Sequence, residues 1–216
     1  LPFTLISDPL QSDLSRFRVL VLADLALISD ELLSVVRSYV QQGGGLVMTG
    51  QATRFDEHSY RRKEAGLADL FAKPLDTNAI QGSSGKGLAV YVPEIVIPDT
   101  FRVGMLPRNH TELLKAVNWA ANGPLQITVE APETVSMSLY SQPSGLRILH
   151  LVNYDKKHPA AEIAVTVQLP SEKLIHSVTL LSPDFEGTQT VATEQSGRRL
   201  HFVVPRLEIY DLLVIG

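Results

Sequence analysis

The sequence contains no cysteine, only one tryptophan and no long hydrophobic run. Without cysteine, disulfides, thiolate zinc sites and thiol nucleophiles are all excluded. No apolar segment approaches the roughly 20 residues that a membrane-spanning helix needs, so no membrane partner is predicted. The 19 Lys and Arg residues are outnumbered by 23 Asp and Glu, which gives a net charge of -4. Because binding to nucleic-acid phosphates needs a basic surface, no nucleic-acid partner is predicted either.

The chain nevertheless has enough apolar material to fold, since 44% of its 216 residues are hydrophobic. That amount can fill one full core or two smaller ones. The lack of cysteine does not decide the compartment, because a disulfide-free protein can be exported. Between the two possibilities, a cytoplasmic location is favoured. The chain opens on Leu1-Pro2-Phe3, without an initiator Met or a signal-like segment. Either a leader was removed or the chain is a piece of a longer protein, and we expect the second.

The first half of the chain has the pattern of alternating strands and helices. Phe17 to Leu22 is continuously apolar apart from Arg18, as expected of a parallel strand buried on both faces. Ser29 is a suitable N-cap for a helix that the glycines at 43–45 end. The other expected elements are strands at 3–6, 46–49 and 88–92, a short helix at 66–72 and a longer helix at 109–122.

The second half of the chain has a different pattern. After Pro124, short apolar or alternating runs are separated by Pro, Gly, Asn and Ser, at the spacing typical of an antiparallel sandwich. This change predicts a domain boundary near residues 122–125. The predicted fold is therefore an α/β domain at 1–124 followed by an antiparallel β-sandwich domain at 125–216.

The strongest candidate for function is the polar loop at 53–62, which leaves the carboxyl end of a predicted central strand. Open α/β sheets bind ligands outside those ends. Asp56 and Glu57 supply carboxylates, His58 titrates near neutral pH, and Arg54 can hold a carboxylate or orient a sugar hydroxyl. The alternative is a solvated loop whose charges pair with one another. We expect these four residues to contact a ligand or a neighbouring subunit, and we nominate no catalytic residue.

Other stretches of the sequence do not match the spacing of known functional motifs. The stretch Gly82-Ser-Ser-Gly-Lys-Gly87 has the composition of a phosphate-binding loop, but it lacks the first glycine and the magnesium-binding hydroxyl of that pattern, so a turn is predicted there instead. The six histidines are scattered, with no pair at metal-ligand spacing, and there is no Gly-x-Ser-x-Gly elbow. Neither a metal site nor a cofactor is predicted. The single tryptophan, Trp119, falls in a predicted helix, which leaves a sugar-binding platform on the sandwich with little support.

In their order along the chain, several segments resemble the β-galactosidase trimerisation domain, which follows a catalytic barrel in family 42 and related glycoside hydrolases. The segments are Pro2-Phe-Thr-Leu-Ile-Ser-Asp8, Arg18-Val-Leu-Val-Leu, Ser29-Asp-Glu, Tyr39-Val-Gln-Gln-Gly-Gly-Gly-Leu-Val, Thr49-Gly, Asp56-Glu57, Leu67-Ala-Asp-Leu-Phe71, Gly85-Lys-Gly and Val90-Tyr-Val-Pro93. The later stretches His150-Leu-Val-Asn-Tyr154 and Val204-Pro-Arg-Leu-Glu-Ile-Tyr210 are similar to the β-sandwich that follows that domain.

The resemblance implies a flavodoxin-like, class I glutamine amidotransferase-like fold for residues 1–124, with its first strand and helix preceding Leu1. In amidotransferases such a scaffold carries a catalytic cysteine, which would be expected in the turn at 50–52, where this chain has none. The resemblance also implies that the catalytic carboxylates belong to an upstream barrel, so none is assigned to a residue of this chain.

The leading hypothesis is a non-catalytic, carboxyl-terminal portion of a β-galactosidase-like glycoside hydrolase, which serves oligomerisation and flanks the active site. Its expected partners are its own upstream catalytic barrel and further copies of itself, and carbohydrate is left open as a ligand. Two alternatives remain. One is a stand-alone hydrolase that uses the 53–62 loop with a bound metal or a water activated by His58. The other is a carbohydrate-binding module that uses the sandwich.

Overall fold

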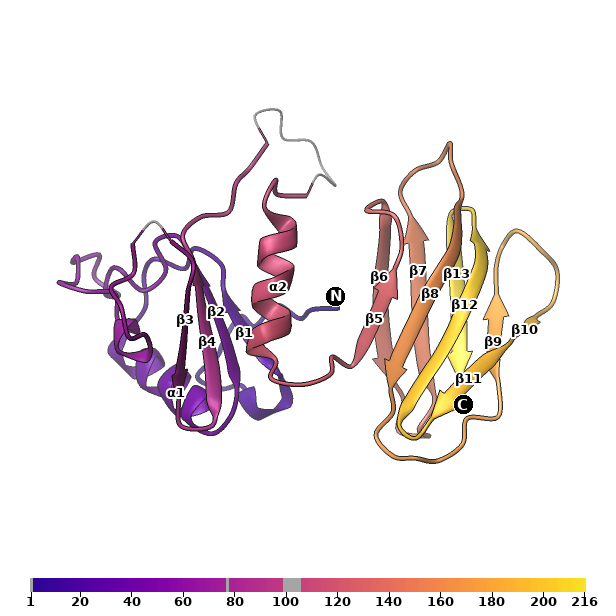
Figure 1. The fold of residues 1–216 in the computed structure, drawn as a ribbon, viewed down its shortest axis with the longest axis horizontal. Helices are drawn as coiled ribbons and strands as arrows, with labels where there is room; N and C mark the ends of the chain where they lie inside the picture. The colour runs from indigo at the N-terminus through magenta and orange to yellow at the C-terminus, as the bar shows by residue number, and fades with distance from the viewer. Residues whose placement is uncertain (1, 77, 99–105) are drawn as a thin grey trace. The chain divides into compact units, whose positions relative to one another are not determined.

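A computed structural model describes residues 2–76, 78–98 and 106–216 of the chain (Figure 1). Contacts between Cα atoms divide the chain into two compact units. One unit is Leu5–Pro124, and the other is mainly Leu125–Gly216. Each unit has its own hydrophobic core and is described separately below. The predicted domain division at 1–124 and 125–216 stays a prediction.

The unit Leu5–Pro124 is built on a four-stranded sheet with the strand order β1-β2-β4-β3. Strands β1, β2 and β4 are parallel, whereas β3 pairs with β4 in the antiparallel direction. The strands are β1 (Val19–Leu22), β2 (Gly45–Thr49), β3 (Ile80–Ser84) and β4 (Gly87–Val92). The helices are α1 (Asp30–Gln41) and α2 (His110–Ala120), with the 3-10 turns η1 (Leu14–Arg16) and η2 (Ala68–Leu70).

The two helices bury different faces of this sheet. Helix α1 begins after Ser29, whose hydroxyl accepts a hydrogen bond from the backbone N–H of Leu32 at 3.2 Å, as an N-cap does. Its apolar side chains share a core with alternate residues of β2 and β4. Helix α2 packs Ala116 and Ala120 against the remaining residues of those strands. Strand β2 is therefore buried at every position, as expected of a central strand covered on both faces.

The second unit consists of two antiparallel sheets that share one core. The five-stranded sheet has the order β10-β9-β13-β7-β6, and the four-stranded sheet has the order β11-β12-β8-β5 (Figure 1). The strands are β5 (Ile127–Glu130), β6 (Val135–Ser141), β7 (Arg147–Asn153), β8 (Ala160–Gln168), β9 (Val178–Leu181), β10 (Gln189–Val191), β11 (Thr193–Ser196), β12 (Arg199–Leu207) and β13 (Tyr210–Ile215). Alternate residues of both sheets point inward and form a core that includes Leu149, Phe202 and Leu213.

The predicted α/β flavodoxin-like fold is wrong. Within the described ranges the chain is mostly β, with 13 strands in three sheets and only two short α-helices, so the fold is sandwich-like. A flavodoxin-like fold links its parallel strands through helices, and here only the connection from β1 to β2 does so. Between β2 and β4 the chain instead forms a long loop, the η2 turn and the antiparallel strand β3.

Three local predictions fail for related reasons. The apolar run at 3–6 forms no strand, because no neighbouring strand pairs with it. The helix expected at 66–72 is reduced to the three residues of η2. The segment Gly82–Gly87, predicted as a turn, begins inside strand β3, whose only apolar residue is Ile80. A side chain at Gly82 would overlap the carbonyl oxygen of Leu70, so the glycine allows η2 to approach this edge strand closely.

The inward face of the sandwich contains two ionisable groups, Arg147 and Asp211, whose charged forms are disfavoured by burial. Asp211 lies on the inward face of β13 with 2% of its surface exposed, and its Oδ2 atom has no hydrogen-bond partner. Burial raises the pKa of this carboxyl, a hydrogen bond with Ser182 offsets part of the rise, and the negative charge of Asp184 adds to it. The fold therefore shifts Asp211 towards its protonated form, relative to an aspartate in water.

We expect Asp211→Asn to stabilise the protein at neutral pH by about 1–2 kcal/mol, because the amide keeps the shape of the carboxylate but carries no charge that burial penalises. Because the pKa is raised in the folded state, the carboxyl causes no penalty below its ordinary value of 3.8 and destabilises the fold as pH rises through the raised pKa. Chemical unfolding across this pH range measures the difference. Asp184→Asn, at an exposed position, should give a smaller change of the same sign. Equal stability of the wild type and Asp211→Asn at neutral pH would contradict this account.

Candidate functional site

The turn after β2, where a catalytic nucleophile would be expected on such a sheet, is occupied by structural hydrogen bonds. The carboxylate of Asp24 accepts from the backbone N–H of Gln51 at 2.6 Å, and the backbone N–H of Asp24 donates to Thr49 Oγ1 at 2.9 Å. The hydroxyl of Tyr91 donates to the carbonyl oxygen of Gly50 at 3.0 Å. Gly50 has a φ of +55°, and a Cβ there would overlap the Asp24 carboxylate. These contacts fix where the following loop begins.

The loop at 53–62 is attached along its length to the segment that follows β1. The backbone N–H of Thr53 donates to the carbonyl of Leu25 at 2.8 Å, and that of Phe55 donates to Ala26 at 3.0 Å. The backbone N–H of Ile28 then donates to Phe55 at 3.1 Å, which makes a parallel bridge between positions 27 and 55. This pairing places the loop at the carboxyl edge of the sheet, as the sequence predicts.

Two of the four nominated side chains hold the loop together. Arg54 Nη2 donates to the carbonyl oxygen of Leu75 at 2.9 Å. The Asp56 carboxylate accepts from the backbone N–H groups of His58 and Tyr60, at 2.9 and 2.8 Å. It therefore closes a tight turn by bonding its own backbone, as short carboxylates often do. Arg54 and Asp56 are occupied by structural roles in this conformation.

The other two nominated side chains lie at the exposed tip of this turn. The side chain of His58 is 73% exposed and that of Glu57 is 48% exposed, and His58 Nε2 lies 4.0 Å from Glu57 Oε1. A general base needs a partner that orients it and a reacting atom within hydrogen-bond reach. The described residues supply neither of these to His58. The pair is therefore exposed to solvent at the tip of the loop.

Apolar residues beside the loop are the part of this edge that sequence reasoning missed. Tyr60 is 72% exposed, and Leu25 and Leu27 are 42% and 48% exposed. All three belong to the backbone-paired segments of the loop. Exposed apolar side chains indicate a contact surface only where they form a contiguous patch. The signal was present in the sequence as Leu25-Ala-Leu27 directly after a buried strand, where turn residues would be expected.

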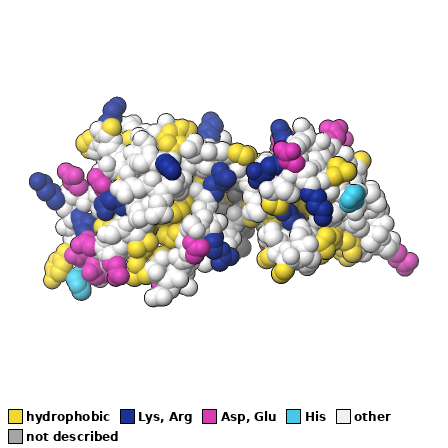
Figure 2. Space-filling view, turned by 90° about the horizontal axis from the view of Figure 1, so that it is seen from below, with side chains coloured by type: hydrophobic (Ala, Val, Ile, Leu, Met, Phe, Trp, Pro, Cys, Tyr) yellow, Lys and Arg dark blue, Asp and Glu magenta, His cyan; other side chains and the backbone are white. Residues whose placement is uncertain are grey.

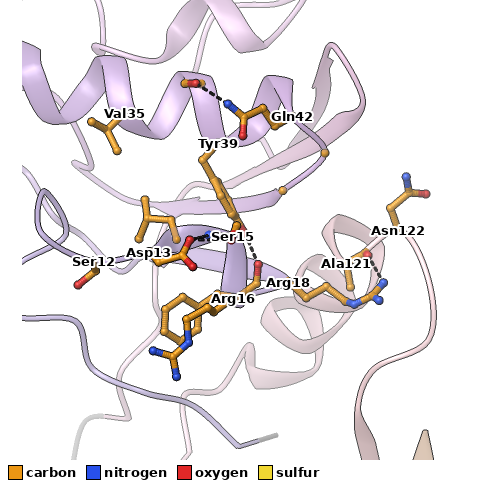
Figure 3. Close-up of a pocket in the computed structure, with 15 residues that line it drawn as sticks. Ser12, Asp13, Ser15, Arg16, Arg18, Val35, Tyr39, Gln42, Ala121 and Asn122 are labelled. Atoms are coloured by element: carbon orange, nitrogen blue, oxygen red, sulfur yellow. Dashed lines mark hydrogen bonds between the residues drawn. The ribbon is translucent and has the colours of Figure 1, made fainter. Parts of the chain in front are cut away.

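A cavity of about 740 Å³ lies at the opposite edge of the sheet, next to the amino ends of β1 and β2 (Figure 3). The Tyr39 hydroxyl donates to the carbonyl of Phe17 at 3.1 Å, and Arg18 Nη1 donates to the carbonyl of Ala121 at 3.3 Å. Burial raises the pKa of Tyr39 to about 12, so its hydroxyl stays protonated near neutral pH and cannot serve as a base. These side chains tie three chain segments together.

The face of the molecule that Figure 2 shows favours no single class of charged ligand. Figure 2 shows acidic, basic and hydrophobic side chains interspersed over the face in view. Among the described residues, no group of three His, Asp or Glu side chains is arranged to hold a metal ion. Neither described helix has the length and apolar character that a membrane span requires.

No family model and no curated protein matches the chain. Among solved structures, the fold is similar to α-L-fucosidase isoenzyme 2 from Paenibacillus thiaminolyticus, with a TM-score of 0.62, 17% identity and coverage of 96% of this chain and 42% of that one. A β-galactosidase from Bacillus circulans sp. alkalophilus has a TM-score of 0.58 and 12% identity, over 95% of this chain and 34% of that one. Gan42B, a GH42 β-galactosidase from G. stearothermophilus, has a TM-score of 0.53 and 16% identity, over 95% of this chain and 32% of that one.

These similarities establish the fold alone, because the sequence identities are low. The alignments nevertheless extend over both units of the chain. The chain spans less than half the length of each of these structures. The neighbours in fold are thus glycoside hydrolases, and the shared part is a minor share of each.

The different roles of Arg54 and His58 are testable by stability. Arg54→Ala leaves the Leu75 carbonyl without its partner and should destabilise the unit by about 1–2 kcal/mol. The matched variant His58→Ala removes an exposed side chain and should change stability by less than about 0.5 kcal/mol. Urea unfolding followed by the fluorescence of Trp119, which belongs to the same unit, measures both. If the two variants are equally stable, Arg54 does not hold the loop.

Proposed function

We propose that this chain is a non-catalytic portion of a glycoside hydrolase, which joins subunits and flanks the sugar cleft. The observation that carries the proposal is the fold similarity, which spans 95–96% of this chain but only 32–42% of three glycoside hydrolases. A module shared in this way can support catalysis without supplying the reacting groups. The catalytic carboxylates would then belong to a separate barrel domain, which is the first expected partner.

The carboxyl edge of the sheet is the surface that we assign to contact with a neighbouring subunit. Leu25, Leu27 and Tyr60 supply exposed apolar area there, and Glu57 and His58 form a polar border. Protein interfaces commonly combine an aromatic or aliphatic centre with a polar rim. Arg54 and Asp56 contribute by holding the loop in shape, so that all four nominated residues serve this contact, two of them indirectly.

The absence of catalysis in the isolated chain is directly testable. Chromogenic β-galactosides and α-L-fucosides represent the substrates of the neighbours in fold. We expect no turnover of either class above the buffer rate, because the carboxylate pair that glycoside hydrolysis requires would lie in the barrel. Saturable turnover that survives repeated purification and depends on His58 would overturn the proposal in favour of a stand-alone hydrolase.

The contact assigned to the loop predicts that Tyr60→Ser weakens association between copies. Tyrosine side chains often contribute a large share of the binding free energy at protein interfaces. Loss of the Tyr60 ring should therefore lower the association constant about tenfold, which is about 1.4 kcal/mol of binding free energy. Because Tyr60 is 72% exposed, its removal should not disturb the fold. Leu174→Ser, which removes an apolar side chain that is 61% exposed on the other unit, is the control. An unchanged association constant for Tyr60→Ser would remove the loop from the contact.

A further inference from the structure

The outward face of the five-stranded sheet carries no Asp, Glu, Lys or Arg. Strand alternation and the inward core residues identify its members. They are Ser136, Ser138 and Tyr140 on β6, Ile148, His150 and Val152 on β7, Tyr210, Leu212 and Val214 on β13, Thr179 and Leu181 on β9, and Thr190 on β10. An antiparallel sheet facing water normally alternates hydrophobic inward residues with polar outward ones. This face departs from that rule on its central strands.

The other sheet of the same unit follows the rule. Its outward positions include Glu130 on β5, Glu194 on β11 and Arg199 on β12, and all three are exposed. The two sheets share one core but differ in what they present outward. The uncharged face is therefore a property of one surface and does not follow from the composition of the unit.

A row of rings crosses the uncharged face. Tyr140 and His150 pack edge to face with their centroids 5.5 Å apart, and His150 and Tyr210 lie 6.0 Å apart with a tilt of 35°. The Tyr210 hydroxyl and His150 Nδ1 are 2.7 Å apart, within hydrogen-bond distance. The row spans the adjacent strands β6, β7 and β13, and Tyr140 is 60% exposed. Interface centres are rich in aromatic side chains and poor in Lys, Glu and Asp, as this face is.

We infer that this face binds the same face of a second copy of the chain. The inference rests on the proposed subunit-joining role but concerns a surface on the other unit, distinct from the 53–62 loop. In a twofold contact each patch meets itself, so any charge on it is brought towards its own copy. A face without charged residues avoids that repulsion and requires no buried ion pairs. Charge neutrality thus makes the face complementary to itself.

The size of the face sets the strength of the contact. Strands lie about 4.8 Å apart and rise about 3.3 Å per residue, so the five strands of this face, which have three to seven residues each, cover roughly 400 Å². Packing two such faces removes on the order of 1,000 Å² from water in total, which is near the lower limit for a specific interface. The dimer should therefore be weak and reversible, with a dissociation constant of about 10–100 µM.

Sedimentation equilibrium of the chain from about 5 µM to 500 µM tests the inference, because this range brackets the expected constant. We expect the average mass to rise from 23.7 kDa towards twice that value. Ser138→Lys places a charge on the exposed edge strand β6, opposite His150, and should weaken the dimer at least about tenfold. Thr128→Lys makes the same change on β5, the exposed edge strand of the other sheet, and should have no effect.

The outcomes separate this inference from the proposed function. A dimer that Ser138→Lys and Thr128→Lys affect equally overturns the sheet-face contact alone. A chain that stays monomeric throughout overturns both the sheet-face contact and the subunit-joining role, while the substrate assay still tests catalysis separately. A dimer sensitive to Tyr60→Ser alone assigns the contact to the loop instead. Tyr140→Ser removes the exposed ring and provides a second test, because this substitution should also weaken the dimer. Tyr140 resonances that respond to an oligosaccharide and not to protein concentration would assign the face to sugar and overturn the inference.

Discussion

The unit Leu5–Pro124 depends on one buried strand, β2, which is covered along its whole length. Its backbone pairs with β1 on one side and β4 on the other, and each helix packs against one of its faces. At its start, a side chain on Gly45 would overlap the carbonyl oxygen of Ala120, so only glycine allows the end of α2 to lie so close. At its end, Thr49 accepts a hydrogen bond from Asp24, which follows β1, and Gly50 accepts one from Tyr91 of β4. The position of the 53–62 loop follows from these constraints.

The same principle of burial explains why the loop has little capacity for chemistry. A loop that leaves a buried strand must satisfy its backbone groups as it turns over the edge of the sheet. Here the side chains of Asp24, Arg54 and Asp56 form hydrogen bonds with backbone groups. In this conformation these side chains are therefore not free to react. What remains exposed is the tip and the apolar residues beside it. Such a surface is suited to contact with a partner.

Local patterns were most informative where one element decides its own structure. The helix after Ser29 was predicted and is found at Asp30–Gln41, because capping and helical spacing act within a few residues. The buried strand at 46–49 and the strand at 88–92 were found for the same reason. The strand β3 pairs with β4 but was missed, because Gln-Gly-Ser-Ser lacks the alternating apolar residues that predict a strand. The prediction of a flavodoxin-like fold failed because this strand was missed, since the fold class depends on how the strands are connected.

The amino-acid sequence by itself determined the strongly periodic elements, the lack of thiol chemistry and the candidate loop with its four polar residues. Only the tertiary structure decided that Arg54 and Asp56 bond to backbone groups while Glu57 and His58 face water. It also decided that Tyr140, His150 and Tyr210, which are far apart in the chain, form one row on an uncharged face. The physical reason is that hydrogen-bond partners and shared surfaces arise from contacts between distant segments, which local spacing does not encode.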